Sequence, residues 1–238
     1  HCHSDRYHIE HPDGEIKLRQ GVTLEMVGNC GASLAPLVAQ RAQEAVDHAV
    51  GGSGRFKGAV DWLGYGQYAA KVAAARPIVN VMGLVGHGTL RIAAMGFAAR
   101  PAKPDELARM EALLDEAMAE GAAGMSSGLY YAPGLFAATE EVVALSRVVA
   151  RRGGYYATHL RNEAEGLLDS LDEAITIGRA AGVPVHVSHL KAAGWRNWHL
   201  ADAAVARIEA ARAEGLDVTV DVYPYHFSST SLLTVIPP

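Results

Sequence analysis

Five side chains that could bind a transition metal lie at or near the ends of apolar segments: His1, His3, Cys30, His159 and His189. His1 and His3 are two residues apart, so on an extended strand their side chains point to the same side. A thiolate combined with neutral imidazoles is a ligand set well matched to zinc. Zinc with an open coordination position can activate water for hydrolysis. These residues therefore predict a catalytic zinc site.

Taken singly, each candidate has an ordinary structural role. A lone cysteine is usually a small buried hydrophobic residue, and a lone histidine usually lies at the surface or in a hydrogen bond. The shared position at strand ends is what favours metal binding here. His87 ends a strand and is a candidate substrate contact, whereas His186 has the opposite strand parity to His189 and is expected to face the helices. The remaining histidines fall in predicted loops or helices: His8, His11, His48 and His199.

A repeated unit of short apolar strand, turn and amphipathic helix would position these residues. The predicted strands are residues 1–4, 22–30, 79–87, 122–128, 155–161, 183–191 and 216–225. The predicted helices are residues 105–120, 139–152, 163–181 and 200–214. Residues 41–57 are expected to form a surface loop.

Alternation of strands and helices implies an α/β fold with a parallel sheet and helices outside it. Seven strands favour a (β/α)8 TIM-like barrel that is one strand short, and residues 1–238 form one domain. Catalytic groups of such barrels gather where strands end and loops begin. A doubly wound open sheet is the competing architecture, but the glycine-rich phosphate loop expected after its first strand is missing.

Composition narrows the classes of partner. The chain of 238 residues has a formal net charge of -5 and no basic cluster, which argues against binding to nucleic acid or an anionic membrane. The sequence contains no uninterrupted run of about 18 apolar residues, so no membrane-spanning helix is expected. Two cysteines are too few for a disulfide framework, so a cytoplasmic location is expected.

Several motifs follow one another in the order known from one enzyme family. They are HCHSD (1–5), VGNCGASLAPL (27–37), GLVGHGTLR (83–91), SSGLYYAPG (126–134), ATHLRNE (157–163), VSHLKAAG (187–194) and DVYPY (221–225). Together they resemble the D-aminoacylase branch of the amidohydrolase superfamily. The cysteine after VGN is the most specific feature, because most of that superfamily has a lysine or glutamate as the bridging ligand. The resemblance implies zinc-dependent hydrolysis of the amide bond of N-acyl-D-amino acids, which are small-molecule substrates.

The resemblance also implies roles for individual residues. Cys30, His159 and His189 would hold a tightly bound zinc ion. His1 and His3, with Cys30 shared, would form a second and weaker metal position. Two further residues, Lys191 and Tyr223, would bind the carboxylate of the substrate.

Two parts of the family pattern are missing: the catalytic aspartate at the end of the eighth strand, and the N-terminal β-sandwich. The chain is therefore expected to be a fragment of a longer enzyme, and its catalytic carboxylate is unknown. Asp221 would share a face with Tyr223 and Tyr225, but the resemblance gives it no catalytic role.

Two other functions stay open. One is an amidohydrolase acting on cyclic amides, such as a hydantoinase or dihydroorotase, although Cys30 argues against it. The other is a truncated barrel that binds zinc without catalysis. Structural zinc sites prefer four protein ligands, so an open coordination position would favour catalysis.

Overall fold

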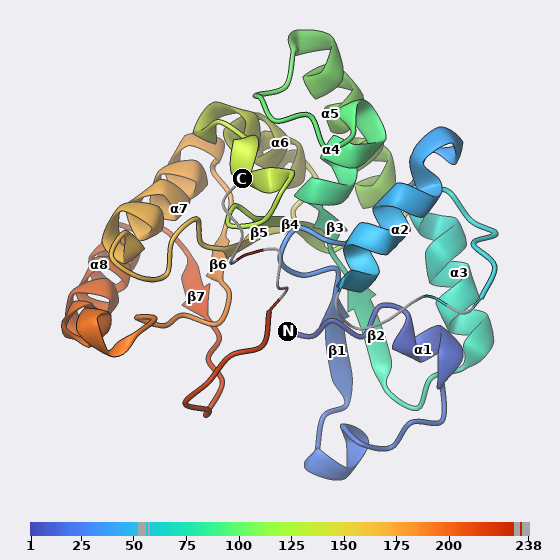
Figure 1. Cartoon of the computed structure of the whole chain (residues 1–238), viewed down its shortest axis with the longest axis horizontal. Coiled ribbons are helices and arrows are strands. Elements are labelled where there is room, and N and C mark those ends of the chain that lie inside the picture. The colour runs from blue at the N-terminus through green and yellow to red at the C-terminus, as the bar shows by residue number, and fades with distance from the viewer. Residues whose placement is uncertain (52–55, 57, 231–233, 235–238) are drawn as a thin grey trace.

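The computed structural model describes residues 1–51, 56, 58–230 and 234. Within this part of the chain, short parallel strands alternate with helices, as the sequence predicts (Figure 1). The strands are β1 (Leu24–Val27), β2 (Asn80–Gly83), β3 (Val85–Gly86), β4 (Gly124–Gly128), β5 (Tyr155–His159), β6 (Val185–Val187) and β7 (Val218–Val220). The α-helices are α1 (Tyr7–Glu10), α2 (Ala42–Val50), α3 (Tyr65–Ala75), α4 (His87–Met95), α5 (Pro104–Ala119), α6 (Thr139–Arg151), α7 (Leu167–Ala181) and α8 (Ala201–Ala213).

Strand order follows the chain. β1 pairs with β2, and β3 to β7 pair one after another, always in parallel. β2 and β3 together match the single strand expected over residues 79–87, interrupted at Leu84, whose backbone N–H donates to the Val27 carbonyl. Strands paired in chain order are expected for the arc of a β/α barrel.

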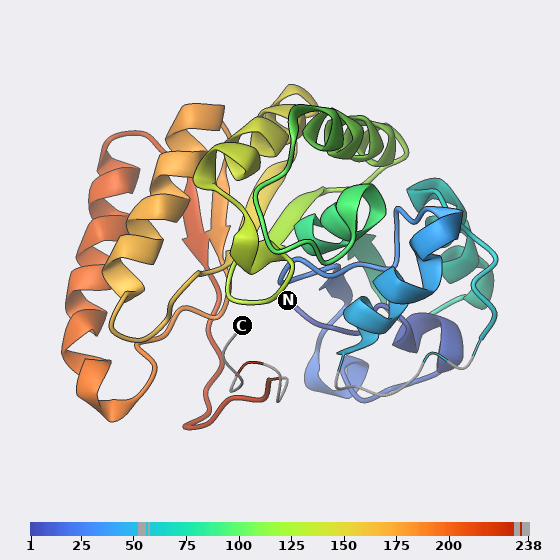
Figure 2. The ribbon, with the colours of Figure 1, turned by 45° about the horizontal axis from the view of Figure 1, so that its top comes forward.

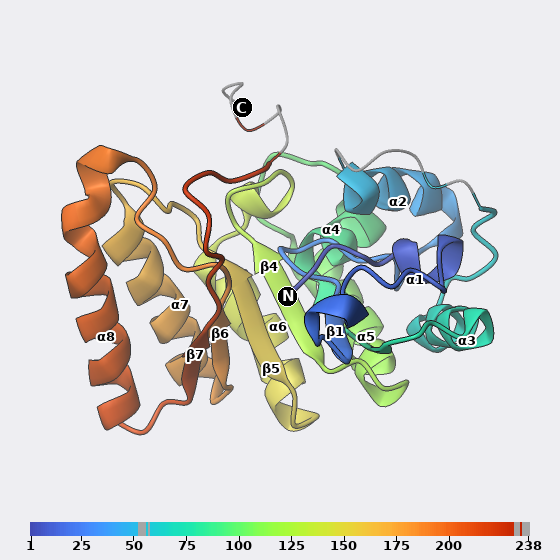
Figure 3. The ribbon, with the colours of Figure 1, turned by 90° about the horizontal axis from the view of Figure 1, so that it is seen from below.

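Helices α5 to α8 lie outside the arc of strands, and the N-terminus lies within it (Figures 2 and 3). Alternation along each strand separates the two faces. In β6, Val185 and Val187 are buried towards the helices, while His186 between them is only half-buried. Among the described residues, no helix has both the length and the apolar content that crossing a bilayer requires.

Two expectations about local structure are wrong. Residues 1–4 are not assigned to a strand; they lie beside β1, and the Cys2 backbone N–H donates to the Met26 carbonyl. Residues 41–57 are not simply a loop, because α2 occupies much of this segment and buries Ala45, Val46 and Val50. Residues 52–55 and 57 of the predicted loop lie outside the described part.

Helix α7 begins later than the sequence suggests, at Leu167 instead of residue 163. The reason is the side chain of Asn162, whose Oδ1 accepts hydrogen bonds from the backbone N–H groups of Ala164 (2.8 Å) and Gly166 (3.3 Å). An asparagine that bonds nearby backbone in this way favours a turn over a helix. Glu163 is thereby kept out of the helix.

A buried carboxylate, that of Glu141 on α6, binds two side chains of α4. Arg91 Nη1 donates to both carboxylate oxygens at 2.7 Å, and His87 Nε2 lies 2.8 Å from Oε1. The side chains of Arg91 and His87 are 0% exposed. Burial alone would raise the pKa of Glu141, but the contacts with His87 and Arg91 outweigh it and lower the pKa to about 2.

Replacing Glu141 by alanine is expected to lower the free energy of unfolding by about 3–5 kcal/mol, because the Arg91 charge is left buried without a partner. Urea denaturation measures the change. Glu140→Ala, at an exposed neighbouring position, is the control and should cost about 0.5 kcal/mol or less. Equal effects of the two substitutions would contradict the buried ion pair.

The same carboxylate predicts a pH dependence. Because the pKa of Glu141 is lowered from 4.5 to about 2 on folding, its ionised form stabilises the protein above pH 4.5. The stability difference between the wild type and Glu141→Gln should be constant above pH 4.5 and shrink as the pH falls towards 2. Urea denaturation at a series of pH values measures it, and a difference that grew on acidification would contradict the prediction.

Candidate metal centre

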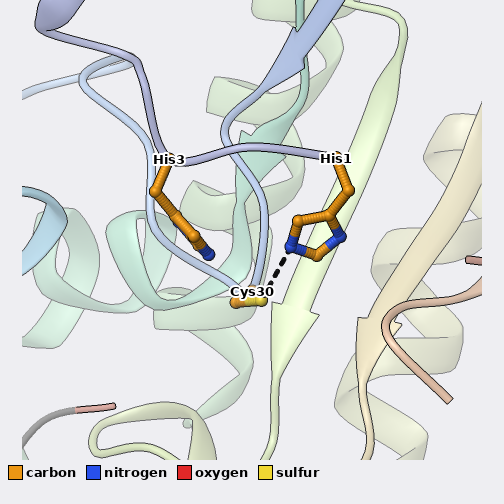
Figure 4. A group of neighbouring side chains, drawn as sticks. All are labelled: His1, His3 and Cys30. Carbon is orange, nitrogen blue, oxygen red and sulfur yellow. Dashed lines mark hydrogen bonds between the residues drawn. The ribbon is translucent and has the colours of Figure 1, made fainter. Parts of the chain in front are cut away.

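The five predicted ligands come together at the carboxyl ends of the strands. Cys30 follows β1, His159 ends β5 and His189 follows β6. They form two groups: His1, His3 and Cys30, and Cys30, His159 and His189. Within each group the ligand atoms lie within 4.8 Å of one another, and Cys30 belongs to both groups. Figure 4 shows both N-terminal imidazoles directed towards the Cys30 sulfur.

The spacing of the ligand atoms fits a tetrahedral ion. Cys30 Sγ lies 3.4 Å from His189 Nε2 and 3.6 Å from His1 Nε2. Zinc–sulfur and zinc–nitrogen bonds of about 2.3 and 2.1 Å at a tetrahedral angle place the two ligand atoms about 3.6 Å apart. Both distances match this value closely, so the residues present suit zinc.

Left-handed backbone conformations direct two of the ligands. Cys30 has φ of 53° and His189 has φ of 38°, a region that non-glycine residues rarely adopt. Such strain gathers at functional sites. The Cys30 turn also needs a close neighbour without a side chain, because a Cβ on Gly128 would lie 2.1 Å from the Cys30 carbonyl oxygen.

The conformation of His189 also explains a wrong prediction. Strict alternation would put His186 and His189 on opposite faces, with His186 towards the helices. The left-handed turn breaks the alternation, and His186 instead contacts Thr219 Oγ1 and Asp221 Oδ2, each at 2.8 Å. His186 therefore belongs to the inner face of the sheet.

Two carboxylates that the sequence did not assign to the site lie behind the ligand imidazoles. Glu163 Oε1 is 2.9 Å from His189 Nδ1, and Asp221 Oδ2 is 3.1 Å from His1 Nδ1. In each ring the other nitrogen, Nε2, faces Cys30. A carboxylate on one imidazole nitrogen orients the other nitrogen towards a metal. Their positions in ATHLRNE and DVYPY were the available signals in the sequence.

Within the described residues, the imidazole of His159 is held by tyrosines and not by a carboxylate on its Nδ1. Tyr131 Oη is 3.4 Å from His159 Nδ1, and the ring of Tyr130 stacks on the His159 ring at a centroid distance of 5.7 Å. Both tyrosines come from the SSGLYYAPG motif, so the loop after β4 supports the ligand at the end of β5.

The protonation states also suit a cation. Burial raises the pKa of the Cys30 thiol, and the charges of Glu163 and Asp221 raise it further. Burial lowers the pKa of His159 to about 3, which keeps this imidazole neutral and able to bind metal. Burial disfavours the charged carboxylates, but hydrogen bonds from His189 and His186 hold the pKa values of Glu163 and Asp221, respectively, below their usual range. A buried thiol between two negative charges ionises readily only beside a cation.

The predicted substrate contacts lie in different places. Lys191 Nζ is 2.7 Å from Glu163 Oε1 and 5.4 Å from the centre of the Tyr223 ring, so Lys191 and Tyr223 adjoin the ligands. His87 is fully buried against Glu141. Its role as a substrate contact stays a prediction.

Cys30→Ala is expected to remove the ligand shared by both groups. Zinc affinity should fall by more than about 100-fold, beyond the 10- to 100-fold that outer residues usually contribute. Isothermal titration of the metal-free protein measures this. Cys2→Ala is the matched control, because Cys2 Sγ instead contacts Glu25 Oε2 at 3.1 Å and the Met26 carbonyl at 3.2 Å. Equal zinc affinity in the Cys30 variant and the wild type would contradict the assignment.

Comparison with known proteins identifies relatives over nearly the whole chain. It is 41% identical to a D-aminoacylase of Alcaligenes xylosoxydans xylosoxydans over 98% of its own length and 47% of the relative's. It is 39% identical to an N-acyl-D-glutamate deacylase of the same organism, over 98% of its own length and 46% of the relative's. The chain thus spans about half the length of these curated relatives. No family model matches the sequence.

Solved structures agree with the sequence comparison. A crystal structure of a D-aminoacylase described as defining a novel subset of amidohydrolases has a TM-score of 0.83 and 40% identity, over 94% of this chain and 46% of the other. A D-aminoacylase studied for its binuclear metal centre has a TM-score of 0.85 and 40% identity, with the same coverage. An N-acyl-D-glutamate deacylase from Bordetella bronchiseptica, in complex with zinc and a phosphonate inhibitor, has a TM-score of 0.83 and 36% identity, again over 94% of this chain and 46% of the other.

The order of parallel strands, the helices outside them and these structural matches confirm the predicted fold, an incomplete barrel of the amidohydrolase type. The chain is thus similar, in sequence over 98% of its length and in fold, to the D-aminoacylase branch of the amidohydrolases.

Proposed function

We propose that residues 1–238 form the metal-binding part of the catalytic barrel of an enzyme that hydrolyses the amide bond of N-acyl-D-amino acids. The observation that carries the proposal is the pair of ligand groups sharing Cys30. The names of the relatives, D-aminoacylase and N-acyl-D-glutamate deacylase, support the substrate class.

In this proposal Cys30, His159 and His189 hold a tightly bound zinc ion, and His1 and His3 share Cys30 in a second, weaker position. The zinc complex and the binuclear centre of the structural relatives support this choice. Zinc supplies a Lewis acid for the acyl carbonyl and allows water to ionise near neutral pH. Burial keeps the His159 imidazole neutral, Glu163 and Asp221 orient His189 and His1, and the surrounding residues exclude most water from Cys30.

Lys191 and Tyr223 are proposed to bind the substrate carboxylate. The ammonium group of Lys191 is held by Glu163 Oε1 and stays partly exposed, with 22% of the side chain accessible, so it can also meet a ligand anion. With the carboxylate and the acyl carbonyl both fixed, the substituents of only one enantiomer fit the remaining directions. The relatives' names indicate that this is the D enantiomer.

The two alternative functions fit less well. Each ligand group in the described residues offers three protein ligands, whereas structural zinc sites usually have four. Three ligands favour a catalytic site over a purely structural one. A cyclic-amide hydrolase of the usual type would have a lysine in place of Cys30.

The function is tested by loading the complete source protein with zinc and measuring amine release from N-acetyl-D-methionine and its L enantiomer. The proposal predicts release from the D form alone, and none from Cys30→Ala. Activity on both enantiomers, or on cyclic amides only, would exclude the D-aminoacylase activity. Bound zinc without any hydrolysis would favour the non-catalytic alternative.

Lys191→Met is expected to raise KM by about 10- to 100-fold, with a smaller change in kcat, because a hydrogen bond to a charged group contributes about 1.5–3 kcal/mol. Steady-state kinetics with N-acetyl-D-methionine measure both constants. Lys71→Met, which removes an ion pair with Asp61 at the surface, is the control and should leave KM unchanged. A KM unaffected by Lys191→Met would remove this residue from the substrate site.

A further inference from the structure

The chain of contacts behind His1 extends beyond the ligands. Asp221 Oδ2 lies 3.1 Å from His1 Nδ1 and 2.8 Å from His186 Nε2, and Asp221 Oδ1 accepts a hydrogen bond of 2.6 Å from the His189 backbone N–H. His186 Nδ1 in turn lies 2.8 Å from Thr219 Oγ1. These side chains line one hollow of about 690 Å³ on the inner face of the sheet.

We infer that Asp221, braced by His186, is the positioning residue that sets metal affinity at the His1–His3–Cys30 group. This inference rests on the metal site proposed above. It says that the affinity of the weaker metal position depends on a residue that does not affect the tighter position. It concerns His186 of β6 and Asp221, which directly follows β7; neither is a proposed metal ligand.

The contact with Asp221 determines the tautomer of His1. An ionised carboxylate only accepts hydrogen bonds, so the proton of a neutral His1 ring lies on Nδ1, beside Asp221. The lone pair of Nε2 then faces Cys30 Sγ at 3.6 Å, where a metal ligand is required. Without the carboxylate, either nitrogen can carry the proton and the ring can turn.

The two histidines of this group differ in their support, because in the described part of the chain His1 contacts a carboxylate and His3 does not. Among the described residues, the His3 ring makes no comparable hydrogen bond to a carboxylate; it packs edge-on against the His1 ring at a centroid distance of 5.4 Å. Orientation of this histidine pair therefore depends on the contact between His1 and Asp221. The residues 1 and 221 also come from opposite ends of the arc, next to β1 and after β7.

His186 holds Asp221 in place from the side away from the ligands. Its Nε2 lies 2.8 Å from Asp221 Oδ2 and its Nδ1 lies 2.8 Å from the Thr219 hydroxyl, so both ring nitrogens have a partner. The side chains of Asp221 and His1 are 28% and 14% exposed, so both are partly shielded from solvent. His186 limits the rotation of Asp221 from the side away from the ligands.

The test is a zinc titration of the metal-free protein against a competing chelator, which resolves two binding constants. Asp221→Asn keeps an oxygen for the His189 N–H, but its amide group donates to His1 Nδ1 and selects the wrong tautomer. The second constant should weaken by about 10- to 100-fold while the first changes by less than about threefold.

Variants of His186 separate positioning from general stability. His186→Leu should weaken the second constant, whereas His186→Gln, whose amide can donate to Asp221, should restore much of it. His199→Leu, at an exposed histidine, is the matched control and should change neither constant. Thermal unfolding of each metal-free variant checks that all of them fold.

The outcomes are distinguishable. An unchanged second constant in Asp221→Asn, or equal weakening of both constants, would overturn this inference and leave the metal site intact. Failure of the wild type to bind any zinc would overturn the proposed function and this inference together.

Discussion

In the proposed metal site, the buried Cys30 thiol has to ionise among carboxylates, and the rest of the site depends on this constraint. Burial and the charges of Glu163 and Asp221 all oppose formation of the Cys30 thiolate. A cation bound by neutral imidazoles would reverse this balance, because its positive charge stabilises the ionised form of each acidic group around it and offsets the cost of burying that charge. The same carboxylates that disfavour the thiolate also orient the rings that would bind the cation. Ligand charge and ligand orientation are therefore linked.

The fold meets this constraint through the geometry of its strand ends. Parallel strands of two neighbouring sheets bring residues distant in sequence, such as Cys30, His159 and His189, to the same carboxyl ends of the strands. Two of these ligands leave their strands through left-handed turns, which aim the side chains away from the regular alternation. The close approach of Gly128 to the Cys30 carbonyl leaves no room for a side chain, so the ligand turn and β4 determine each other's position.

Much of this arrangement could be predicted from sequence, because it depends on the periodicity of apolar residues and on the order of motifs along the chain. The order of the strands and the candidate ligands follow from apolar segments and motifs, although most strands are shorter than predicted: β1 ends at Val27, not at residue 30, and β6 ends at Val187, not at residue 191. Other features depend on tertiary contacts. Alternation could not reveal the left-handed turn that breaks the pattern between His186 and His189, and the helical pattern concealed the Asn162 turn that keeps Glu163 out of α7. His87 sits at a strand end as expected, but its partner Glu141 lies far along the chain.

The most direct test of the central claim, a zinc ion bound by Cys30, is X-ray absorption spectroscopy of the protein loaded with one equivalent of zinc. If Cys30 binds the zinc, the spectrum should show one sulfur neighbour at about 2.3 Å together with nitrogen neighbours at about 2.0–2.1 Å. Substitution of Cys30 should remove the sulfur contribution, and substitution of Cys2 should leave it unchanged. A spectrum with only oxygen and nitrogen neighbours would contradict the claim, because the shared thiolate would then not bind the metal.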